Sequence, residues 1–523
     1  MGKKVVVVGA GPGGLTAGML LAHNGYDVHI YEKNDYVGGR NGRIELGEFK
    51  FDIGPTFLML PEVLEDIFRF TGRNLNDYLE MKEIEPLYRL RFHGKLDFYP
   101  SRDKKYMKDQ IEKLFPGDEN GYEYYMEKEK VKFERIFNCL KIPYDRFIHF
   151  FRPAFLKAIP KLDIGKSLYG KLSEYFKHEE MRIAMTFQSK YLGMSPWNCP
   201  GAFTILSYIE HSGGIFHPVG GLNTISEAMA RIVKEEGGSI HLSTPVNEVI
   251  VENGKAKGVY LENGERIMAD YVVINADFAH AMTHIVREEN RKKYTDKDLS
   301  RRDYSCSTFM LYLGLDKEYD ITHHNIIFAK DYRKNVEEIA KTKVISNDPS
   351  FYIHNASITD PTLAPKGKSS LYVLVPVPNN SSGIDWDAHK ESFRRLVLDK
   401  IKEKTELKDI EKYIVVEKVI TPLDWEREYG VYKGATFNLS HKLTQMLYFR
   451  PHNKFQEFKS CYIVGGGTHP GSGLPTIYES GRISANLILQ DGKMGLGYNY
   501  FDVFENSFRG GTGRNSSPKK VTL

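Results

Sequence analysis

The chain begins with an alternation of short apolar runs and helical patterns. Residues 5–8 are four consecutive valines, which is typical of a strand buried in a parallel sheet. A glycine-rich turn follows, then a helical stretch over 15–24 and a second strand over 27–31. The order strand, turn, helix, strand predicts a βαβ unit at the start of the chain.

The pattern changes in the middle of the chain. Residues 101–215 are rich in Lys, Phe and Tyr and indicate a mostly helical region, and a helix is also expected over 222–233. Asn-Gly pairs at 253–254 and 263–264 separate short alternating strands, so they predict successive β-hairpins. A further strand is expected over 271–275.

The last third of the chain mixes both kinds of element. From 301 to 450, strands and helices alternate around proline-rich turns, and 375–378 is expected to be one of these turns. A last strand over 461–464 leads through a glycine-rich segment into a closing helix over 476–489. Residues 508–523 contain few apolar side chains and predict a disordered tail.

Composition narrows the class of protein. With 523 residues, 41% hydrophobic and 27% charged, the chain can bury large cores and is not a disordered or fibrous protein. With a net charge of +4, basic and acidic residues are too evenly balanced for a dedicated nucleic-acid binder.

The four cysteines are far apart and form no C-x-x-C pair, so neither a disulfide framework nor a metal site is expected, and a reducing cytoplasmic compartment fits them. No signal peptide and no apolar stretch long enough for a transmembrane helix are found.

The turn after the first strand has the spacing G-x-G-x-x-G at Gly9, Gly11 and Gly14. The first glycine permits a tight turn, the second lets a pyrophosphate approach the backbone, and the third lets helix and strand pack closely. Glu32 follows 18 residues after Gly14 and can accept hydrogen bonds from ribose hydroxyls. The alternative is a phosphate-free turn with a solvated Glu, but the strand and helix on either side favour a dinucleotide site.

The next segment distinguishes between dinucleotides, since both NAD and FAD would suit the first unit. Residues 37–40 read Val-Gly-Gly-Arg, and Arg40 is a good charge-assisted partner for a phosphate. The alternative is a glycine turn with a surface Arg. The Gly-Gly-Arg segment resembles the second phosphate-side motif of the amine oxidase and carotenoid desaturase flavoproteins, and together with the first motif this resemblance favours FAD.

These motifs resemble those of the bacterial carotenoid desaturases, the phytoene and diapophytoene (dehydrosqualene) desaturase family of the FAD-dependent amine-oxidase-like superfamily. The resemblance runs from Val5 to about Leu489. It includes the two glycine motifs and the segments 51–56, 217–221 and 468–475. The stretches 303–307, 313–315, 325–328 and 382–386 look closest to the diapophytoene branch.

The resemblance implies an α/β fold: a Rossmann-type FAD-binding domain with an inserted α+β substrate domain and a helical membrane-associating region. The expected FAD-binding domain is discontinuous and comprises 1–100, 216–300 and 451–495. The helical region is expected over 101–215 and the substrate domain over 301–450.

The resemblance also implies the residues that hold FAD, which is expected to be bound non-covalently. Glycine-motif residues, Glu32 and Arg40 belong on its adenosine and pyrophosphate half, and the backbone of Val246 meets the adenine. Leu474 and Pro475 belong near the flavin ring, and Gly466 stands where amine oxidases usually carry an acidic residue. The full expected set is Gly9, Gly11, Pro12, Gly13, Gly14, Glu32, Lys33, Gly39, Arg40, Pro55, Thr56, Val246, Gly466, Leu474 and Pro475.

The activity implied is the dehydrogenation of a linear C30 or C40 carotenoid precursor such as diapophytoene or phytoene, with quinone or oxygen as the electron acceptor. Removing two hydrogens requires a hydride acceptor and an outlet for a proton. Glu210 lies in a mostly apolar stretch, where desolvation raises a carboxyl pKa toward neutrality, and is the candidate base. A Glu bonded to a nearby helix end is the alternative, and Asp52 is expected to serve a structural turn.

A long apolar isoprenoid substrate requires access from a membrane. Residues 135–171 contain eight Lys/Arg, two acids and five Phe, which suits a surface lying in the headgroup layer. The chain is therefore expected to be cytoplasmic and peripherally, monotopically attached to the inner face of the cell membrane. The alternative is that these Phe side chains are core and the basic residues only a solvated face.

Three other functions share this architecture: a flavin amine oxidase, a carotenoid end-group oxidase, and a prenyl-binding protein of the GDI type. No aromatic cage or recognition carboxylate for a cationic amine is evident. The intact glycine motif disfavours the GDI type, which does not depend on FAD. Substrate length, C30 or C40, stays open at this point.

Overall fold

The computed structural model describes residues 2–492, so the expected tail over 508–523 lies outside the described residues. A five-stranded parallel sheet with the order β19-β13-β1-β2-β9 lies at its centre. Its strands are β1 (Lys4–Val8), β2 (Asp27–Tyr31), β9 (Ser239–His241), β13 (Tyr271–Ile274) and β19 (Cys461–Ile463). The first, second and last strands expected from the sequence are therefore confirmed.

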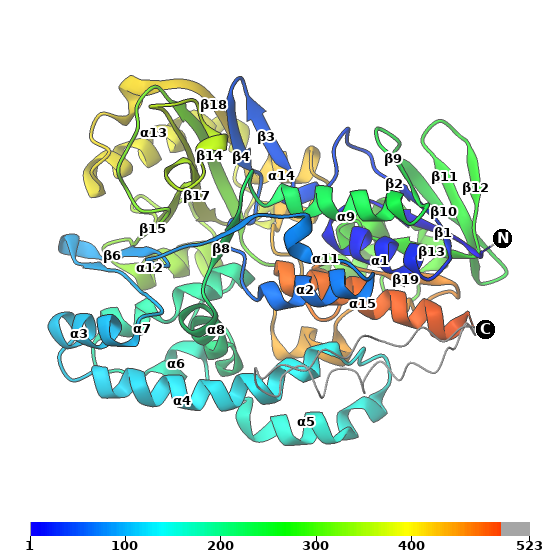
Figure 1. Ribbon diagram of the computed structural model, residues 1–523, viewed down its shortest axis with the longest axis horizontal. Helices are drawn as coiled ribbons and strands as arrows, with labels where there is room; N and C mark the ends of the chain where they lie inside the picture. Colours follow the sequence, from blue (N-terminus) through cyan, green and yellow to red (C-terminus); the bar gives the residue numbers. More distant parts are fainter. Residues whose placement is uncertain (1, 493–523) are drawn as a thin grey trace.

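Both faces of this sheet are buried, which explains the unbroken run of valines. Val5 and Val7 pack in one core with helices α1 (Pro12–His23), α9 (Asn223–Glu235) and α15 (Leu474–Asp491). Val6 and Val8 pack in a second core with the opposite side of the domain. Figure 1 shows α1 lying between α9 and α15.

Glycines set the close approach of these elements. A Cβ at Gly14 would lie 2.4 Å from the carbonyl oxygen of Gly9, so helix α1 packs against the turn only because residue 14 has no side chain. A Cβ at Gly481 would lie 2.5 Å from the carbonyl oxygen of Gly13, so α15 is held equally close to α1. Gly13 and Gly14 therefore have a packing role.

The two Asn-Gly turns form the expected hairpins. Strands β10 (Val246–Glu252), β11 (Lys255–Leu261) and β12 (Arg266–Met268) make a three-stranded antiparallel sheet. Val246 pairs with Leu261 at its start.

A seven-stranded mixed sheet forms the second layer of the molecule, in the order β18-β14-β17-β16-β15-β6-β7. Helix α13 (Trp386–Lys404) covers one face through a core that includes Trp386, Phe393 and Leu398. The strands are β6 (Arg89–Arg91), β7 (Asp97–Phe98), β14 (Ser307–Leu315), β15 (His324–Ile327), β16 (Phe351–Asn355), β17 (Ser369–Val377) and β18 (Ile414–Ile420).

The expected proline-rich turn at 375–378 is wrong, because most of that segment belongs to strand β17. Pro376 pairs with Thr308 of β14. On its other side β17 pairs with β16 only as far as Leu374, so Pro376 lies beyond the end of that ladder. Proline is tolerated in a strand where its missing N–H faces an unpaired edge.

The expected domain boundary at residue 100 also needs correction. Strands β6 and β7 lie within 1–100 but belong to the seven-stranded sheet, where β6 pairs in parallel with β15. The chain therefore enters the second layer at about residue 89, earlier than its composition indicates.

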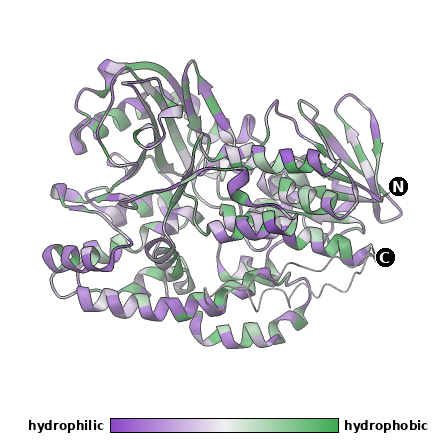
Figure 2. Ribbon diagram, viewed as in Figure 1, coloured by the Kyte–Doolittle hydropathy of each residue, from purple (hydrophilic) through white to green (hydrophobic). Residues whose placement is uncertain are grey.

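Residues 101–215 form a mostly helical layer, as expected (Figure 1). Its α-helices alternate with short 3₁₀ turns, and α5 shows both hydrophobic and polar segments in Figure 2. Within residues 2–492, no helix is both long and apolar enough to span a bilayer. The helices are α3 (Lys104–Leu114), α4 (Glu119–Ile136), α5 (Pro153–Ala158), α6 (Leu168–Leu172), α7 (Glu179–Ala184) and α8 (Ile205–Gly213).

Shorter elements connect the layers. Two antiparallel pairs join β3 to β4 and β5 to β8. These and the other connecting elements are β3 (Arg43–Leu46), β4 (Phe49–Asp52), α2 (Pro61–Phe70), β5 (Met81–Glu83), β8 (Phe216–Pro218), α10 (Phe278–His284), α11 (Asp296–Arg301), α12 (Tyr332–Glu337) and α14 (Pro422–Arg427).

Candidate functional site

A cavity of about 600 Å³ runs from the glycine turn after β1 to the seven-stranded sheet. Its volume is within the range of small-molecule sites. One end is lined by backbone and charged groups, and the other by aromatic and aliphatic side chains. The cavity therefore joins the two layers at the carboxyl ends of the parallel strands, where α/β folds bind their ligands.

The polar end is built from two glycine segments that face each other. Gly9, Gly11 and Pro12 line it from one side, with Gly11 at the N-cap of α1. Gly39 lines it from the other, and a Cβ added there would meet only the Cα of Gly11, at 3.9 Å. Gly39 has φ +54°, which favours glycine, so the gap between the segments is kept free of side chains. A gap between glycines at a helix N-terminus fits a pyrophosphate.

Glu32 lies at the polar end and joins the glycine turn after β1 to the backbone that follows β2. Its carboxylate accepts hydrogen bonds from the backbone N–H groups of Ala10 at 2.7 Å and Asn34 at 3.0 Å. Burial raises its pKa, while these two hydrogen bonds and the charge of Lys33 oppose the rise. Each oxygen keeps a lone pair for a further donor, such as a ribose hydroxyl. The ammonium of Lys33, in contrast, donates to the carbonyl oxygen of Glu428 at 2.7 Å.

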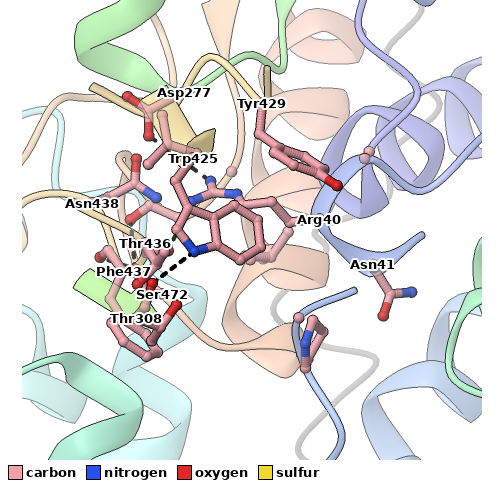
Figure 3. Close-up of a pocket in the computed structure, with 18 of the residues that line it drawn as sticks. Arg40, Asn41, Asp277, Thr308, Trp425, Tyr429, Thr436, Phe437, Asn438 and Ser472 are labelled. Carbon is pink, nitrogen blue, oxygen red and sulfur yellow. Dashed lines mark hydrogen bonds and ion pairs between the residues drawn. The ribbon is translucent and has the colours of Figure 1, made fainter. Parts of the chain in front are cut away.

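Arg40 points into the cavity from the second glycine segment (Figure 3). Its guanidinium donates to the carbonyl oxygen of Thr436 at 2.8 Å and lies 3.9 Å from a carboxylate oxygen of Asp277. Asp277 itself caps α10 by accepting from the N–H of His280. Arg40 is thus held in place while donors remain for an anion, because a guanidinium has five.

The region beside α15 forms the middle of the cavity. Pro55 and Thr56 line it together with Leu474 and Pro475, the two residues expected near the flavin ring, at the N-terminus of the helix. Val246, expected at the adenine, also lines the cavity.

Gly466 also lines the cavity, and its neighbours leave little room for a side chain. A Cβ there would lie 3.0 Å from Oγ of Ser472 and 3.1 Å from the amide nitrogen of Asn438. An acidic side chain of the amine oxidase kind would therefore require these two groups to move.

The far end of the cavity is an apolar chamber on the inner face of the seven-stranded sheet. Alternate residues of β17, Tyr372, Leu374 and Pro376, face it because side chains alternate along a strand. The other apolar and aromatic side chains of the chamber are Phe57, Phe187, Tyr191, Met310, Ile326, Phe328, Tyr332, Phe351 and Tyr352.

Glu210, the candidate base, does not line this cavity. It is fully buried in α8, one layer behind the wall, and accepts hydrogen bonds from Tyr88 at 2.9 Å and Gln188 at 2.8 Å. Tyr191 does line the cavity, and its pKa is raised first by burial and then by the charge of Glu210. Burial raises the pKa of Glu210 to about 7.

Asp52 also lies outside the cavity lining. It accepts a hydrogen bond from the N–H of Leu222 at 2.8 Å, and burial raises its pKa to about 6. A Cβ at Gly221 would lie 2.8 Å from one of its carboxylate oxygens. Asp52 therefore fixes the turn that precedes α9.

Several residues of the lining were not expected. Asn275 and Asp277 follow strand β13, and polar residues at the carboxyl end of a parallel strand are a signal that could have identified them. Trp425 of α14 and Tyr429, which follows that helix, lie beside Arg40 in Figure 3 and have no such signal. Lys190 lines the apolar chamber, and burial lowers its pKa.

Comparisons with known proteins agree with this geometry. The family described as flavin containing amine oxidoreductase matches residues 12–489. A 4,4'-diapophytoene desaturase (4,4'-diapolycopene-forming) from Methylomonas sp. is 52% identical over 93% of this chain and 95% of its own length. A zeta-carotene-forming phytoene desaturase from Myxococcus xanthus is 36% identical over 93% and 94%.

Solved structures share the fold at low sequence identity. An oxidoreductase from Methanosarcina mazei superimposes with a TM-score of 0.64 at 18% identity, covering 93% of this chain and all of the other. A Rab GDI from Plasmodium falciparum gives a TM-score of 0.53 at 13% identity, covering 94% and 99%. The fold alone thus does not separate a desaturase from a GDI, whereas the sequence relationships do: the chain belongs to the carotenoid desaturases within the flavin-containing amine oxidoreductase family.

Proposed function

We propose that the protein binds FAD non-covalently and uses it to dehydrogenate a linear C30 carotenoid precursor of the diapophytoene type. The observation that carries the proposal is the single cavity that connects the glycine cradle with an apolar chamber. The relative with 52% identity is named for a C30 substrate, which favours C30 over the C40 alternative.

The residues of the polar end suit FAD. Gly11 and Gly39 leave space for a pyrophosphate, Arg40 offers charge-assisted donors, and Glu32 offers acceptors for ribose hydroxyls. When bound, FAD supplies the acceptor for a hydride taken from the substrate. Flavin that is released into solution when the protein is precipitated with acid would establish non-covalent binding.

The apolar chamber supplies what an extended hydrocarbon needs. Tyr352, Tyr372 and Leu374 form part of a wall with few charged groups, so bulk water is excluded. The hydroxyl groups of both tyrosines are engaged, Tyr352 with Thr56 at 2.9 Å and Tyr372 with the carbonyl oxygen of Gly54 at 2.8 Å. Their rings are thereby held in place beside the bound polyene.

The proton released with each hydride needs an acceptor. We assign that role to Glu210, acting through the hydroxyl of Tyr191, because Tyr191 lines the cavity and is close enough to Glu210 to interact with its charge. A carboxyl with a pKa of about 7 is half ionised at neutral pH and is well matched to general base catalysis.

The substrate reaches the protein from a membrane surface formed by the 3₁₀ turn Phe147–Phe151 and helix α5. Phe147, Ile148 and Phe151 have 62%, 69% and 63% of their surface exposed, which is unusual for such large apolar side chains. The exposed Arg146 and Lys157 stand beside them. Apolar side chains flanked by basic ones suit the inner, anionic face of the cell membrane.

The expected surface over 135–171 is smaller than the sequence indicates. Phe137 and Phe155 are buried in cores, and Phe150 is half-buried. Lys171 is paired with Asp163 at 3.4 Å and with Glu174 at 2.8 Å, and Lys166 is paired with Glu174. The core alternative therefore holds for part of the segment, and the exposed apolar residues that support the proposed membrane surface lie within 146–164.

Pigment formation tests the proposal. Cells that make diapophytoene should form coloured, longer polyenes when they also make this chain. With purified protein and liposomes, turnover measured with oxygen and with a quinone would identify the electron acceptor.

A further inference from the structure

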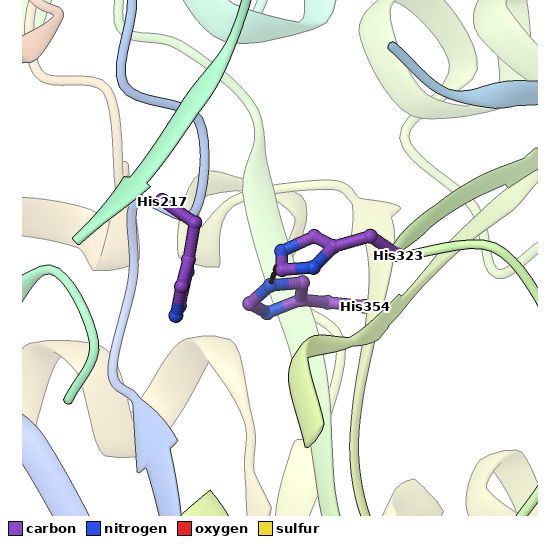
Figure 4. Close-up of side chains that lie close together, drawn as sticks. All are labelled: His217, His323 and His354. Atoms are coloured by element: carbon purple, nitrogen blue, oxygen red, sulfur yellow. Dashed lines mark hydrogen bonds between the residues drawn. The ribbon is translucent and has the colours of Figure 1, made fainter. Parts of the chain in front are cut away.

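Three histidines lie together behind the cavity wall, outside the residues that line it. His217 is on strand β8, His323 directly precedes β15, and His354 is on β16 (Figure 4). All three are buried, and one ring nitrogen of each lies within 4.8 Å of the other two. Segments distant in sequence thus bring three imidazoles close together between β8 and the seven-stranded sheet.

One ring nitrogen of this cluster has no partner. Nδ1 of His217 is buried and makes no hydrogen bond to any residue between 2 and 492. An orphaned buried polar atom costs free energy that folding normally avoids. The rings of His323 and His354 lie beside that of His217, with centroids 5.0 and 6.3 Å away, so the unpartnered nitrogen belongs to a cluster of three imidazoles.

In His217 and His323, one ring nitrogen is hydrogen-bonded to a neighbouring side chain, as is usual for histidines that bind a metal through the other nitrogen. Nε2 of His217 lies 3.0 Å from a carboxylate oxygen of Asp360, and Nδ1 of His323 lies 2.9 Å from the hydroxyl of Thr359. If each of these ring nitrogens carries the proton, Nδ1 of His217 and Nε2 of His323 are left as lone pairs, and in the absence of a metal that of His323 accepts a 2.9 Å hydrogen bond from Nε2 of His354. A carboxylate behind a histidine fixes its tautomer and raises its basicity toward a metal.

Asp360, which lies behind His217, supplies a second observation. Its side chain is fully buried and its only cationic partner within the described part of the chain is His217, so no Lys or Arg compensates its charge. Its carboxylate accepts hydrogen bonds from Gly220 at 2.6 Å and from the backbone and hydroxyl of Thr362 at 3.0 and 2.6 Å. Buried charges are normally compensated by an opposite charge or a metal. A cation among the three imidazoles would supply it.

We propose that His217, His323 and His354 bind a divalent transition-metal ion of the kind that prefers imidazole, such as Zn²⁺, with Asp360 and Thr359 orienting the ligands. Nε2 of His323 and Nε2 of His354 are 2.9 Å apart, and tetrahedral Zn²⁺ at about 2.0–2.1 Å from each nitrogen needs separations of about 3.3 Å. Small side-chain rotations that move the ring nitrogens by roughly 1 Å would bring the three nitrogens to that geometry.

The ion would have a structural role. It would join β8, which leads through the Gly220–Gly221 turn into α9, to strands β15 and β16. His354 and Tyr352 face the same side of β16, since they are two residues apart, so the ion would also stiffen the sheet behind the chamber.

Metal content of the FAD-containing protein tests the proposal. The chain should be produced without a polyhistidine tag, in medium containing Zn²⁺, and freed of loosely bound ions with a chelator. We expect about one equivalent of metal per chain, and at least a tenfold lower content in His323→Gln and in His354→Gln. His324→Gln is the matched control, because His324 is an adjacent buried histidine outside the set, and it should keep its metal.

A second measurement uses wild-type protein and therefore does not depend on whether the variants fold. Wild-type protein stripped of metal should gain the visible absorption of tetrahedral Co²⁺, read beyond the flavin bands, when Co²⁺ is added, and should lose it when Zn²⁺ competes. Added Zn²⁺ should also raise its melting temperature by at least about 2 °C. A metal-free protein without a Co²⁺ spectrum would overturn the proposal, as would a metal retained by both His→Gln variants. A purely structural hydrogen-bond cluster would lower the melting temperature in those variants but would bind no metal.

Discussion

The hydroxyl of Tyr88 donates a 2.9 Å hydrogen bond to the carboxylate of Glu210, and both side chains are completely buried. The second oxygen of that carboxylate has no hydrogen-bond partner within residues 2–492. The carboxyl group is therefore poorly solvated as an anion, which is why its pKa is raised to about 7. Several consequences can be measured.

Glu210→Gln should change how stability depends on pH. The folded protein keeps a proton on Glu210 up to about pH 7, whereas the unfolded chain loses it near pH 4.5. Stability therefore falls as pH rises from about 4.5 to 7, and the full cost is present above pH 7. The glutamine side chain of the variant carries no charge at any of these pH values. The free energy of unfolding of the Glu210→Gln variant, relative to that of the wild type, should therefore increase by about 2–3 kcal/mol between pH 5 and 8. A difference that stays flat with pH would show that Glu210 is ionised normally in the folded protein.

The same variant should keep its flavin and lose turnover, by about 10²-fold or more, because general base catalysis contributes at least that much. In the wild-type enzyme, turnover should rise with pH with an apparent pKa of about 7, since the ionised carboxylate is the active form. Unchanged turnover would remove Glu210 from the mechanism.

Tyr191→Phe tests the route between the cavity and Glu210. Without the hydroxyl, the proton has no carrier through the wall, so we expect at least a tenfold loss of turnover with flavin content unchanged. Tyr294→Phe is the matched control, because its hydroxyl is also buried without a described partner but lies in a different core. Equal turnover in both variants would refute the relay.

Gly11→Val should abolish FAD binding. The added side chain would fill the gap between the two glycine segments, where a Cβ would already lie 2.8 Å from the amide nitrogen of Asn275. Gly213→Val is the control, since a Cβ at the end of α8 would have no described atom within 4 Å. Flavin absorbance per chain is the measurement, and a Gly11→Val protein that remains yellow would contradict the assignment of the cradle.

Binding to anionic liposomes should depend on the exposed apolar residues. Replacing Phe147, Ile148 and Phe151 by Ser should release the protein, whereas Met268→Ser, at another exposed apolar position on β12, should have no effect. Cosedimentation with liposomes is the measurement.

Charge reversal of Arg146, Arg152 and Lys157 should remove the salt-sensitive part of the same binding. At about 1 kcal/mol for each basic residue, the loss amounts to roughly 10²-fold in affinity. FAD content should not change in this triple variant. Undiminished binding would place the membrane surface elsewhere.

The cofactor half of the fold could be predicted from the sequence because its signals are local. Glycine spacing, four consecutive valines and Asn-Gly turns each specify a short piece of backbone, and the structure has the corresponding elements. Of the expected cofactor-binding residues, all but Gly13 and Gly14 line the cavity. Those two are packed against α15 and the first turn, a role that the glycine motif also includes.

The substrate half could be predicted only coarsely, because its contacts join distant segments. Pro376 looks like a turn residue until the end of the ladder between β16 and β17 is known. Glu210 has the burial expected of a base, but its closeness to Tyr191 of the cavity lining depends on tertiary packing. The cluster of His217, His323 and His354 has no spacing signal, since its members meet only when β8 packs against the sheet.

The most direct test of the central claim is pigment analysis of cells that make diapophytoene and this chain, with the Gly11→Val variant as control. Consumption of the colourless precursor and formation of yellow to red products with lengthened polyene absorption is the predicted result, and the variant should leave the precursor unchanged. If the precursor persists although the wild-type protein is present, contains FAD and has membranes and oxygen or quinone available, the proposed function is wrong.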